Sequence, residues 1–143
     1  MSDAYTIIKS IFIAAPREAV WAYLTEADKL GKWYHRGEAD LSEGAPYRLL
    51  SSGEDGKDSA LVWGEVREWS PPSKLVTTFT IGPIGDAETL VTWTLSSVQG
   101  GTRLLLTHEG IANAAGDAPL GLIKALDTGW DKHLSGLRAS ADT

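Results

Sequence analysis

The chain has 143 residues, a net charge of −6 and no cysteine, which suits a single soluble domain over residues 1–143 and excludes disulfides, thiolate metal sites and cysteine nucleophiles. It has no cluster of Lys and Arg, so nucleic acids and anionic membrane surfaces are not expected partners. No signal-peptide pattern is present, and no apolar run approaches the ~18 residues that span a bilayer, so a cytoplasmic protein without membrane insertion is expected.

The N-terminal quarter of the chain predicts one strand followed by two short helices. Residues 5–13 are rich in β-branched and aromatic side chains, which favours a strand. Pro16 fits the first turn of a helix within AAPREAVWAYL, residues 14–24. A second short helix, weakened by Gly31, is predicted within residues 26–34. The tryptophans of these two helices are expected to anchor them to a sheet.

Residues 37–111 predict a meander of about five or six antiparallel strands. Short apolar runs alternate there with the turn-forming segments GEDGKD, SPPS, GPIGD and QGG. In the run TRLLLTH, alternation places Thr102, Leu104, Leu106 and His108 on one face of a strand.

The last segment, residues 118–139, predicts an amphipathic helix, because apolar residues recur there every three or four positions. A curved antiparallel sheet must cover its apolar concave face, and only this helix is long enough to do so. We therefore expect an α+β fold with the sheet wrapped around a long C-terminal helix. Gly129 and Gly136 within the helix suggest either close approach of another element, or a bend, or tolerated surface glycines.

The sequence assigns no metal ligand, cofactor or catalytic residue. The three histidines, His35, His108 and His133, lack ligand-like spacing. There is no G-x-S-x-G nucleophile motif, and acidic pairs such as Glu65 and Glu68 are typical of solvated surface.

His108 and Trp130 each allow two interpretations. His108 is either a structural histidine at a strand end or a group that binds a ligand or acts in acid–base chemistry. Trp130 is either core or the wall of a ligand site, and six tryptophans suit both a bulky core and a lined cavity. Strand alternation leaves the sides of Trp63 and Trp93 open, and Tyr47 or His108 would orient a ligand. The candidate ligand-binding residues are Trp63, Phe79, Trp93, Leu104, Leu106, His108, Trp130 and Leu134.

Four stretches carry a resemblance to a known family: IAAPREAVWAYLTEADKLGKWY, GEVREWSPPSKLVTTF, VTWTLSSVQGGTRLLLTHEGI and GWDKHLSGL. In order and spacing they resemble the bacterial relatives of the C-terminal domain of the heat-shock-protein-90 ATPase activator (AHSA-type). That family is part of the START/Bet v-like, or SRPBCC, superfamily. The resemblance extends from about Ile7 to Leu137.

The resemblance implies a helix-grip fold with about seven strands and a cavity between the sheet and the last helix. The first functional expectation is therefore binding of a small hydrophobic molecule, such as a lipid, without catalysis. One alternative is a cyclase- or hydrolase-type enzyme that uses His108 in the same cavity. Another is a co-chaperone-like module of the stress response, with a protein partner or a homodimer. The eukaryotic activator has an additional N-terminal domain without a counterpart in this sequence, which argues against chaperone activation.

Overall fold

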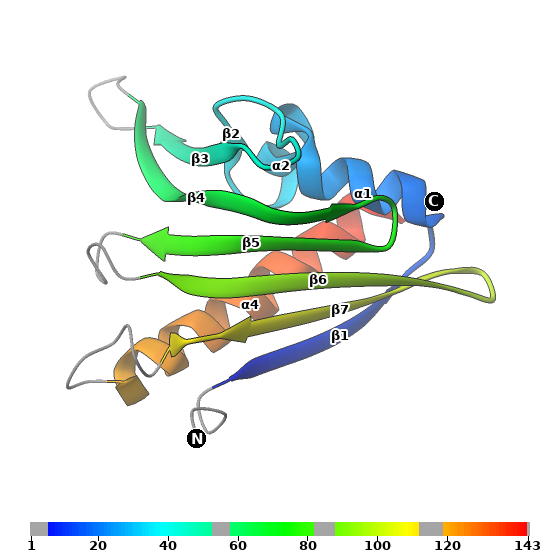
Figure 1. Cartoon of the computed structure of the whole chain (residues 1–143). Coiled ribbons are helices and arrows are strands. Elements are labelled where there is room, and N and C mark those ends of the chain that lie inside the picture. Colours follow the sequence, from blue (N-terminus) through cyan, green and yellow to red (C-terminus); the bar gives the residue numbers. More distant parts are fainter. Residues whose placement is uncertain (1–5, 53–57, 82–87, 112–118, 143) are drawn as a thin grey trace.

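The computed structural model describes residues 6–52, 58–81, 88–111 and 119–142. Within them, seven strands form one antiparallel sheet in the order β1-β7-β6-β5-β4-β3-β2. Helices α1, α2 and α4 all lie on the concave face of this sheet (Figure 1). The elements in chain order are β1 Ile7–Ile13, α1 Arg17–Thr25, α2 Ala27–Trp33, β2 Arg36–Gly37, β3 Pro46–Ser52, β4 Asp58–Ser70, β5 Lys74–Ile81, β6 Thr89–Val98, β7 Gly101–Glu109 and α4 Pro119–Ala141. The predicted fold class is confirmed.

The turns that the sequence predicts are partly within the described residues. SPPS joins β4 to β5, and QGG joins β6 to β7. GEDGKD and GPIGD fall almost entirely outside the described residues, as does the segment that precedes α4. Alternation in β7 is confirmed, because its inward face is fully buried. That face consists of Thr102, Leu104, Leu106 and His108.

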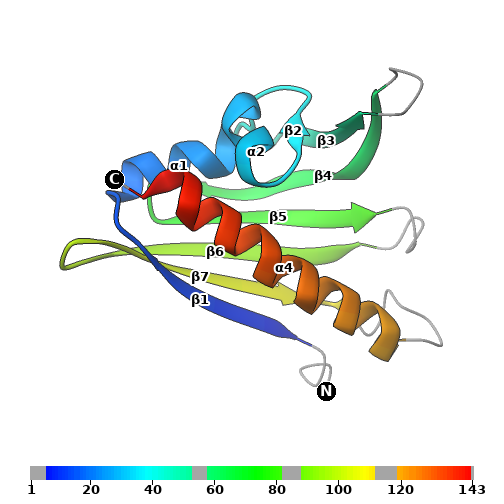
Figure 2. The same cartoon turned by 180° about the vertical axis from the view of Figure 1, so that it is seen from behind.

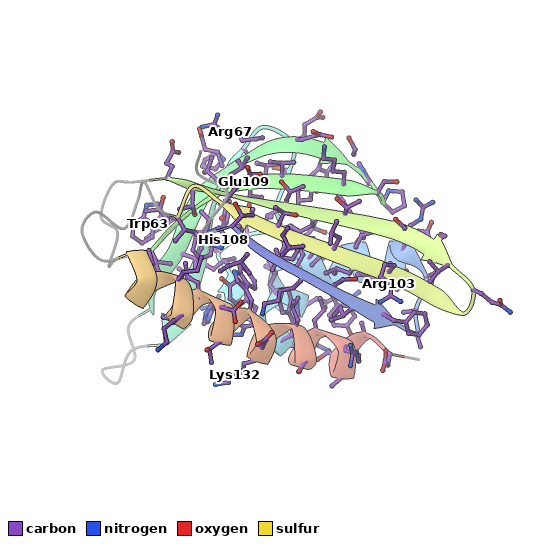
Figure 3. All side chains as sticks on the ribbon, turned by 90° about the horizontal axis from the view of Figure 1, so that it is seen from below. Trp63, Arg67, Arg103, His108, Glu109 and Lys132 are labelled. Atoms are coloured by element: carbon purple, nitrogen blue, oxygen red, sulfur yellow. The ribbon has the colours of Figure 1, made fainter. Side chains whose placement is uncertain are left out.

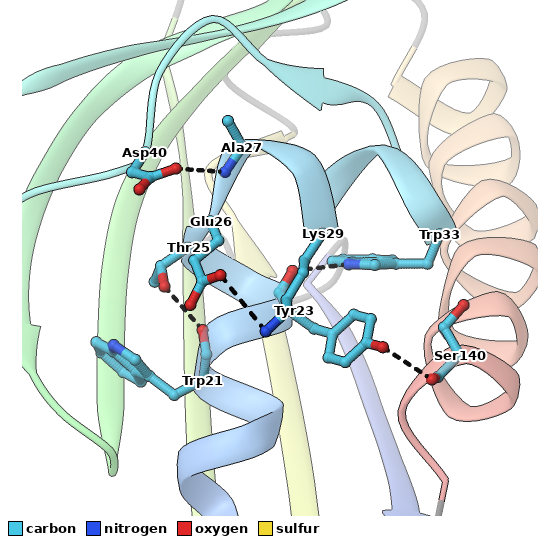
Figure 4. Close-up of polar contacts among 9 residues, drawn as sticks. All are labelled: Trp21, Tyr23, Thr25, Glu26, Ala27, Lys29, Trp33, Asp40 and Ser140. Carbon is cyan, nitrogen blue, oxygen red and sulfur yellow. Dashed lines mark hydrogen bonds and ion pairs between the residues drawn. The ribbon is translucent and has the colours of Figure 1, made fainter.

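Long-range contacts hold the two short helices in place. The backbone N–H of Ala27, at the start of α2, donates to the carboxylate of Asp40 at 2.8 Å (Figure 4). This bond satisfies one of the amides that a helix N-terminus leaves unpaired. Trp33, at the end of α2, donates its indole N–H to the Tyr23 carbonyl, and the Tyr23 hydroxyl donates to the Ser140 carbonyl in α4. Trp33 is therefore bonded to α1, and α1 in turn to α4.

Tryptophan pairs join the short helices to the sheet, as the sequence predicts. Trp21 of α1 packs edge-to-face on Trp69 of β4, with ring centroids 5.2 Å apart. Trp33 packs in the same way on Trp93 of β6 at 6.0 Å. Such pairs contribute about 0.5–1.5 kcal/mol beyond the burial of their surface.

Helix α4 crosses the concave face and runs close to β1 (Figure 2). Trp130, Leu134 and Leu137 on its inner side are almost completely buried. At its outer side Lys9 forms ion pairs with Asp127 and Asp131, each at 2.8 Å. Exposed ion pairs contribute at most about 1 kcal/mol, so the buried apolar residues account for most of the attachment.

The close approach of another element that the two glycines inside α4 suggested is not observed. A methyl group at Gly129 would meet no atom within 4 Å, and one at Gly136 would make only ordinary contact with Trp33, 3.5 Å from its carbonyl oxygen. Neither position requires glycine for packing.

Candidate functional site

A small cavity lies between the concave face of the sheet and helices α2 and α4. Its volume is about 30 Å³, which leaves room for about two water molecules. None of the side chains that form its wall is charged. The wall consists of Leu24, Leu30, Trp33, Tyr34, Leu41, Tyr47, Leu49, Val62, Leu75, Thr77, Phe79, Val91, Trp93 and Trp130. The interior is therefore an apolar space that aromatic side chains nearly fill.

Three of the eight predicted residues, Phe79, Trp93 and Trp130, line this cavity. The remaining buried members pack in the core around it without reaching the space itself. They are Leu104, Leu106, His108 and Leu134.

Trp63 is the one predicted residue that lies on the other side of the sheet. Its neighbour Val62 points inward and lines the cavity, so alternation along β4 turns Trp63 outward. There it lines a surface groove together with Arg48 and Thr80, its cross-strand partners. The expectation that Trp63 lines the cavity is therefore not met.

A buried chain of hydrogen bonds stands behind the cavity wall. The Trp130 indole N–H donates to Nδ1 of His108 at 3.0 Å. Nε2 of His108 lies 2.7 Å from the Thr89 hydroxyl, which in turn donates to the Phe79 carbonyl at 2.8 Å. His108 lies between β7 and α4, whereas Lys132 points away from the sheet (Figure 3). The chain connects α4 to three neighbouring strands.

The direction of these bonds defines the protonation state of His108. An indole N–H can only donate, so Nδ1 accepts and the proton of the neutral ring is on Nε2. Burial lowers the pKa of His108 to about 4, so the ring is neutral at pH 7. Both nitrogens are occupied, and an acid–base role would require one of these bonds to break. In this state His108 holds the ring of Trp130 in the cavity wall.

The side chain of Tyr47 extends from β3 across β4 to β5, at a point where the pairing of β4 with β5 is interrupted. Its hydroxyl donates to the Thr78 carbonyl. The Glu65 amide uses the Thr78 hydroxyl, 2.8 Å away, as acceptor. Gly64 lies opposite Tyr47 in the β3–β4 ladder, so no side chain blocks this path. Burial raises the pKa of Tyr47, and a contact with the Thr77 hydroxyl only partly offsets that effect.

Replacing Gly64 by alanine is expected to destabilise the protein by about 1–3 kcal/mol, the usual cost of overpacking. The added methyl group would lie 2.3 Å from the Thr78 carbonyl oxygen, so β4 and β5 would have to separate where Tyr47 binds. Urea denaturation measures the effect. Gly121→Ala is the control, since a methyl group there meets nothing within 4 Å. Equal stability of the two variants would contradict the prediction.

Tyr34 lies at the seam between α2 and α4. Its ring packs against Trp33 at 5.2 Å, Trp130 at 5.5 Å, His35 at 4.5 Å and His133 at 4.6 Å. Burial raises the pKa of Tyr34 and lowers the pKa of both histidines. Tyr34 is not among the residues predicted from the sequence, although the aromatic run Trp33-Tyr34-His35 at the end of a short helix is a visible signal.

The part of the chain that the structure describes has neither a metal-binding cluster nor a membrane-spanning helix. No group of three or more His, Asp and Glu side chains there could hold a metal ion. Among the helices of those residues, none combines the length and the apolar character that crossing a bilayer demands.

A curved antiparallel sheet that closes on a long C-terminal helix around an apolar cavity is the helix-grip fold of the SRPBCC superfamily. The family model described as activator of Hsp90 ATPase homolog 1-like protein matches residues 14–142, and the chain belongs to this family. A comparison with curated proteins gave no match.

Solved structures show the same fold. CV1439 from Chromobacterium violaceum is 24% identical, with a TM-score of 0.77 and coverage of 97% of this chain and 98% of that one. CalU16 from Micromonospora echinospora is 22% identical, with a TM-score of 0.74 and coverage of 95% and 75%. DynU16, described as a protein in the dynemicin biosynthetic locus, is 22% identical, with a TM-score of 0.75 and coverage of 94% and 46%.

Proposed function

We propose that the protein binds a small hydrophobic molecule between the sheet and α4. The observation that carries this proposal is the internal cavity, whose wall is apolar and aromatic and includes no charged side chain. Ligand sites are typically concave and apolar, with a few polar groups that orient the ligand. Trp130, Phe79 and Trp93 would supply the contact area.

A ligand must displace side chains in order to enter. The cavity measures about 30 Å³, whereas sites for drug-sized ligands measure about 300–1,000 Å³. Tyr34 is the only aromatic residue of the wall that is not fully buried. Its ring is stacked on Trp33 and makes tilted or edge-to-face contacts with the other neighbouring rings, and each such contact contributes only about 0.5–1.5 kcal/mol. The seam between α2 and α4 is therefore the route of entry.

One structural neighbour supports the class of ligand. DynU16 is described as a protein in the dynemicin biosynthetic locus. A protein of that fold beside such a pathway agrees with small-molecule binding in the interior. The enzymatic alternative needs His108 as a free base, but both of its ring nitrogens already take part in hydrogen bonds.

Native and denaturing mass spectrometry of freshly purified protein, combined with ligand-observed NMR against apolar fragments, tests the proposal. We expect either a defined excess mass that is lost on unfolding or saturable binding of fragments. Val91→Phe should fill the cavity and abolish binding, since Val91 is a buried wall residue. Val98→Phe is the matched control, because Val98 lies in the same strand but is 40% exposed. Binding that persists in a folded Val91→Phe variant would refute the proposed site.

A further inference from the structure

No side chain that lines the cavity is charged. Its polar groups are hydroxyls and indole N–H groups, contributed by tyrosine, threonine and tryptophan. An ionised carboxylate or ammonium group buried there would lose its hydration without gaining a countercharge, which costs several kcal/mol. The interior therefore discriminates against fatty acids and other ions of similar shape.

Most aromatic hydrogen-bond donors near the cavity already have acceptors. The indole N–H of Trp33 donates to the Tyr23 carbonyl and that of Trp130 to His108. The hydroxyl of Tyr47 donates to the Thr78 carbonyl.

Two donors of the wall remain without a partner among the described residues: the Trp93 indole N–H and the Tyr34 hydroxyl. Across those residues, Arg17 Nε is the only side-chain polar atom that is both enclosed and unpaired. The donor atoms of Trp93 and Tyr34 therefore retain contact with open space, although the Trp93 side chain as a whole is 6% exposed. Both residues line the cavity, which is the open space on the inner side of β6.

The rings that carry these two donors share the same neighbours. The ring of Trp130 packs against both of them, with centroids 5.6 Å from Trp93 and 5.5 Å from Tyr34. Trp33 does the same from the other side, at 6.0 Å and 5.2 Å. A ligand that reaches the rings of Trp93 and Tyr34 would thus be surrounded by aromatic side chains, a setting that suits a planar aromatic ligand.

We infer that the ligand is an uncharged aromatic compound with an oxygen acceptor, such as a ketone, whose oxygen accepts from Trp93 and Tyr34. This inference rests on the proposed function and specifies the chemistry of its ligand. An apolar ligand that fills the open space beside these donors would leave them without an acceptor, which is costly, so a ligand that carries an acceptor is favoured.

Three compounds of nearly equal shape test the inference: acetophenone, which has a carbonyl oxygen; α-methylstyrene, which replaces that oxygen by a CH₂ group; and benzoate, which carries a charge. In the wild-type protein, acetophenone should move the indole N–H resonance of Trp93 downfield, whereas α-methylstyrene should not. Benzoate should bind at least tenfold more weakly than acetophenone.

Variants separate hydrogen bonding from apolar contact. Tyr34→Phe and Trp93→Phe should each weaken acetophenone about fivefold and leave α-methylstyrene within twofold. Tyr23→Phe is the control, because the Tyr23 hydroxyl donates to α4 outside the cavity.

If the Tyr34 and Trp93 variants weaken both compounds equally, the inference is overturned and the proposed function stands. Tighter binding of benzoate would also overturn it. If neither neutral compound binds the wild-type protein, the proposed function falls together with the inference.

Discussion

Replacing Trp130 by alanine is expected to lower the free energy of unfolding by about 3–5 kcal/mol. The residue is 3% exposed and belongs to the buried core. Its loss leaves a cavity and removes the one donor that the described residues offer to Nδ1 of His108. Urea denaturation monitored by circular dichroism measures the change, since α4 and the sheet should unfold together.

Two phenylalanine variants separate the volume of Trp130 from its hydrogen bond. Trp130→Phe retains a ring but leaves Nδ1 of His108 unpaired, which costs about 1–3 kcal/mol on top of the loss of volume. Trp93→Phe removes the same volume from the same cavity wall without breaking a bond to any described residue. Equal destabilisation of the two variants would show that the bond to His108 contributes nothing.

Stability is expected to decline by about 3 kcal/mol between pH 6.5 and about pH 4 because of His108 alone. Burial lowers its pKa from 6.5 to about 4 in the folded protein. In that window the unfolded chain binds a proton that the folded protein excludes, so the free energy of unfolding decreases as the pH falls. Below about pH 4 both states are protonated, and this contribution levels off.

The pH dependence of the His108→Gln variant isolates this contribution. His35 and His133 also have lowered pKa values in the folded state, so the variant should keep a shallower slope of the same sign. Chemical denaturation at several pH values between 4 and 7 gives both slopes. Parallel curves for the wild type and His108→Gln would contradict the assignment of a neutral, buried His108.

The fold could be predicted because its main signals are periodic. In β7 alternation predicts which residues share a face: Leu104, Leu106 and His108 lie two positions apart, and all three are buried. In β4 both Val62 and Trp63 are large and apolar, so alternation alone cannot tell which one points inward. The side that Trp63 occupies follows from the packing of the whole sheet, which a local pattern does not contain.

The cavity itself was less predictable than the elements around it. Tyr34 follows the end of α2 in non-helical backbone, with φ −135° and ψ −106°, where neither strand nor helix periodicity applies. Its place in the wall depends on contacts with α4, about a hundred residues later in the chain. The small remaining volume likewise depends on how several large side chains fit together in three dimensions.

The bond between His108 and Trp130 also constrains how this chain can diverge. A change at either position alone leaves a buried polar atom without a partner, whereas a paired change to apolar residues removes both atoms at small cost. Because Thr89 depends on the same ring, it is the third member of this group. Mutational paths that replace this hydrogen-bonded group must therefore pass through coordinated substitutions in β6, β7 and α4.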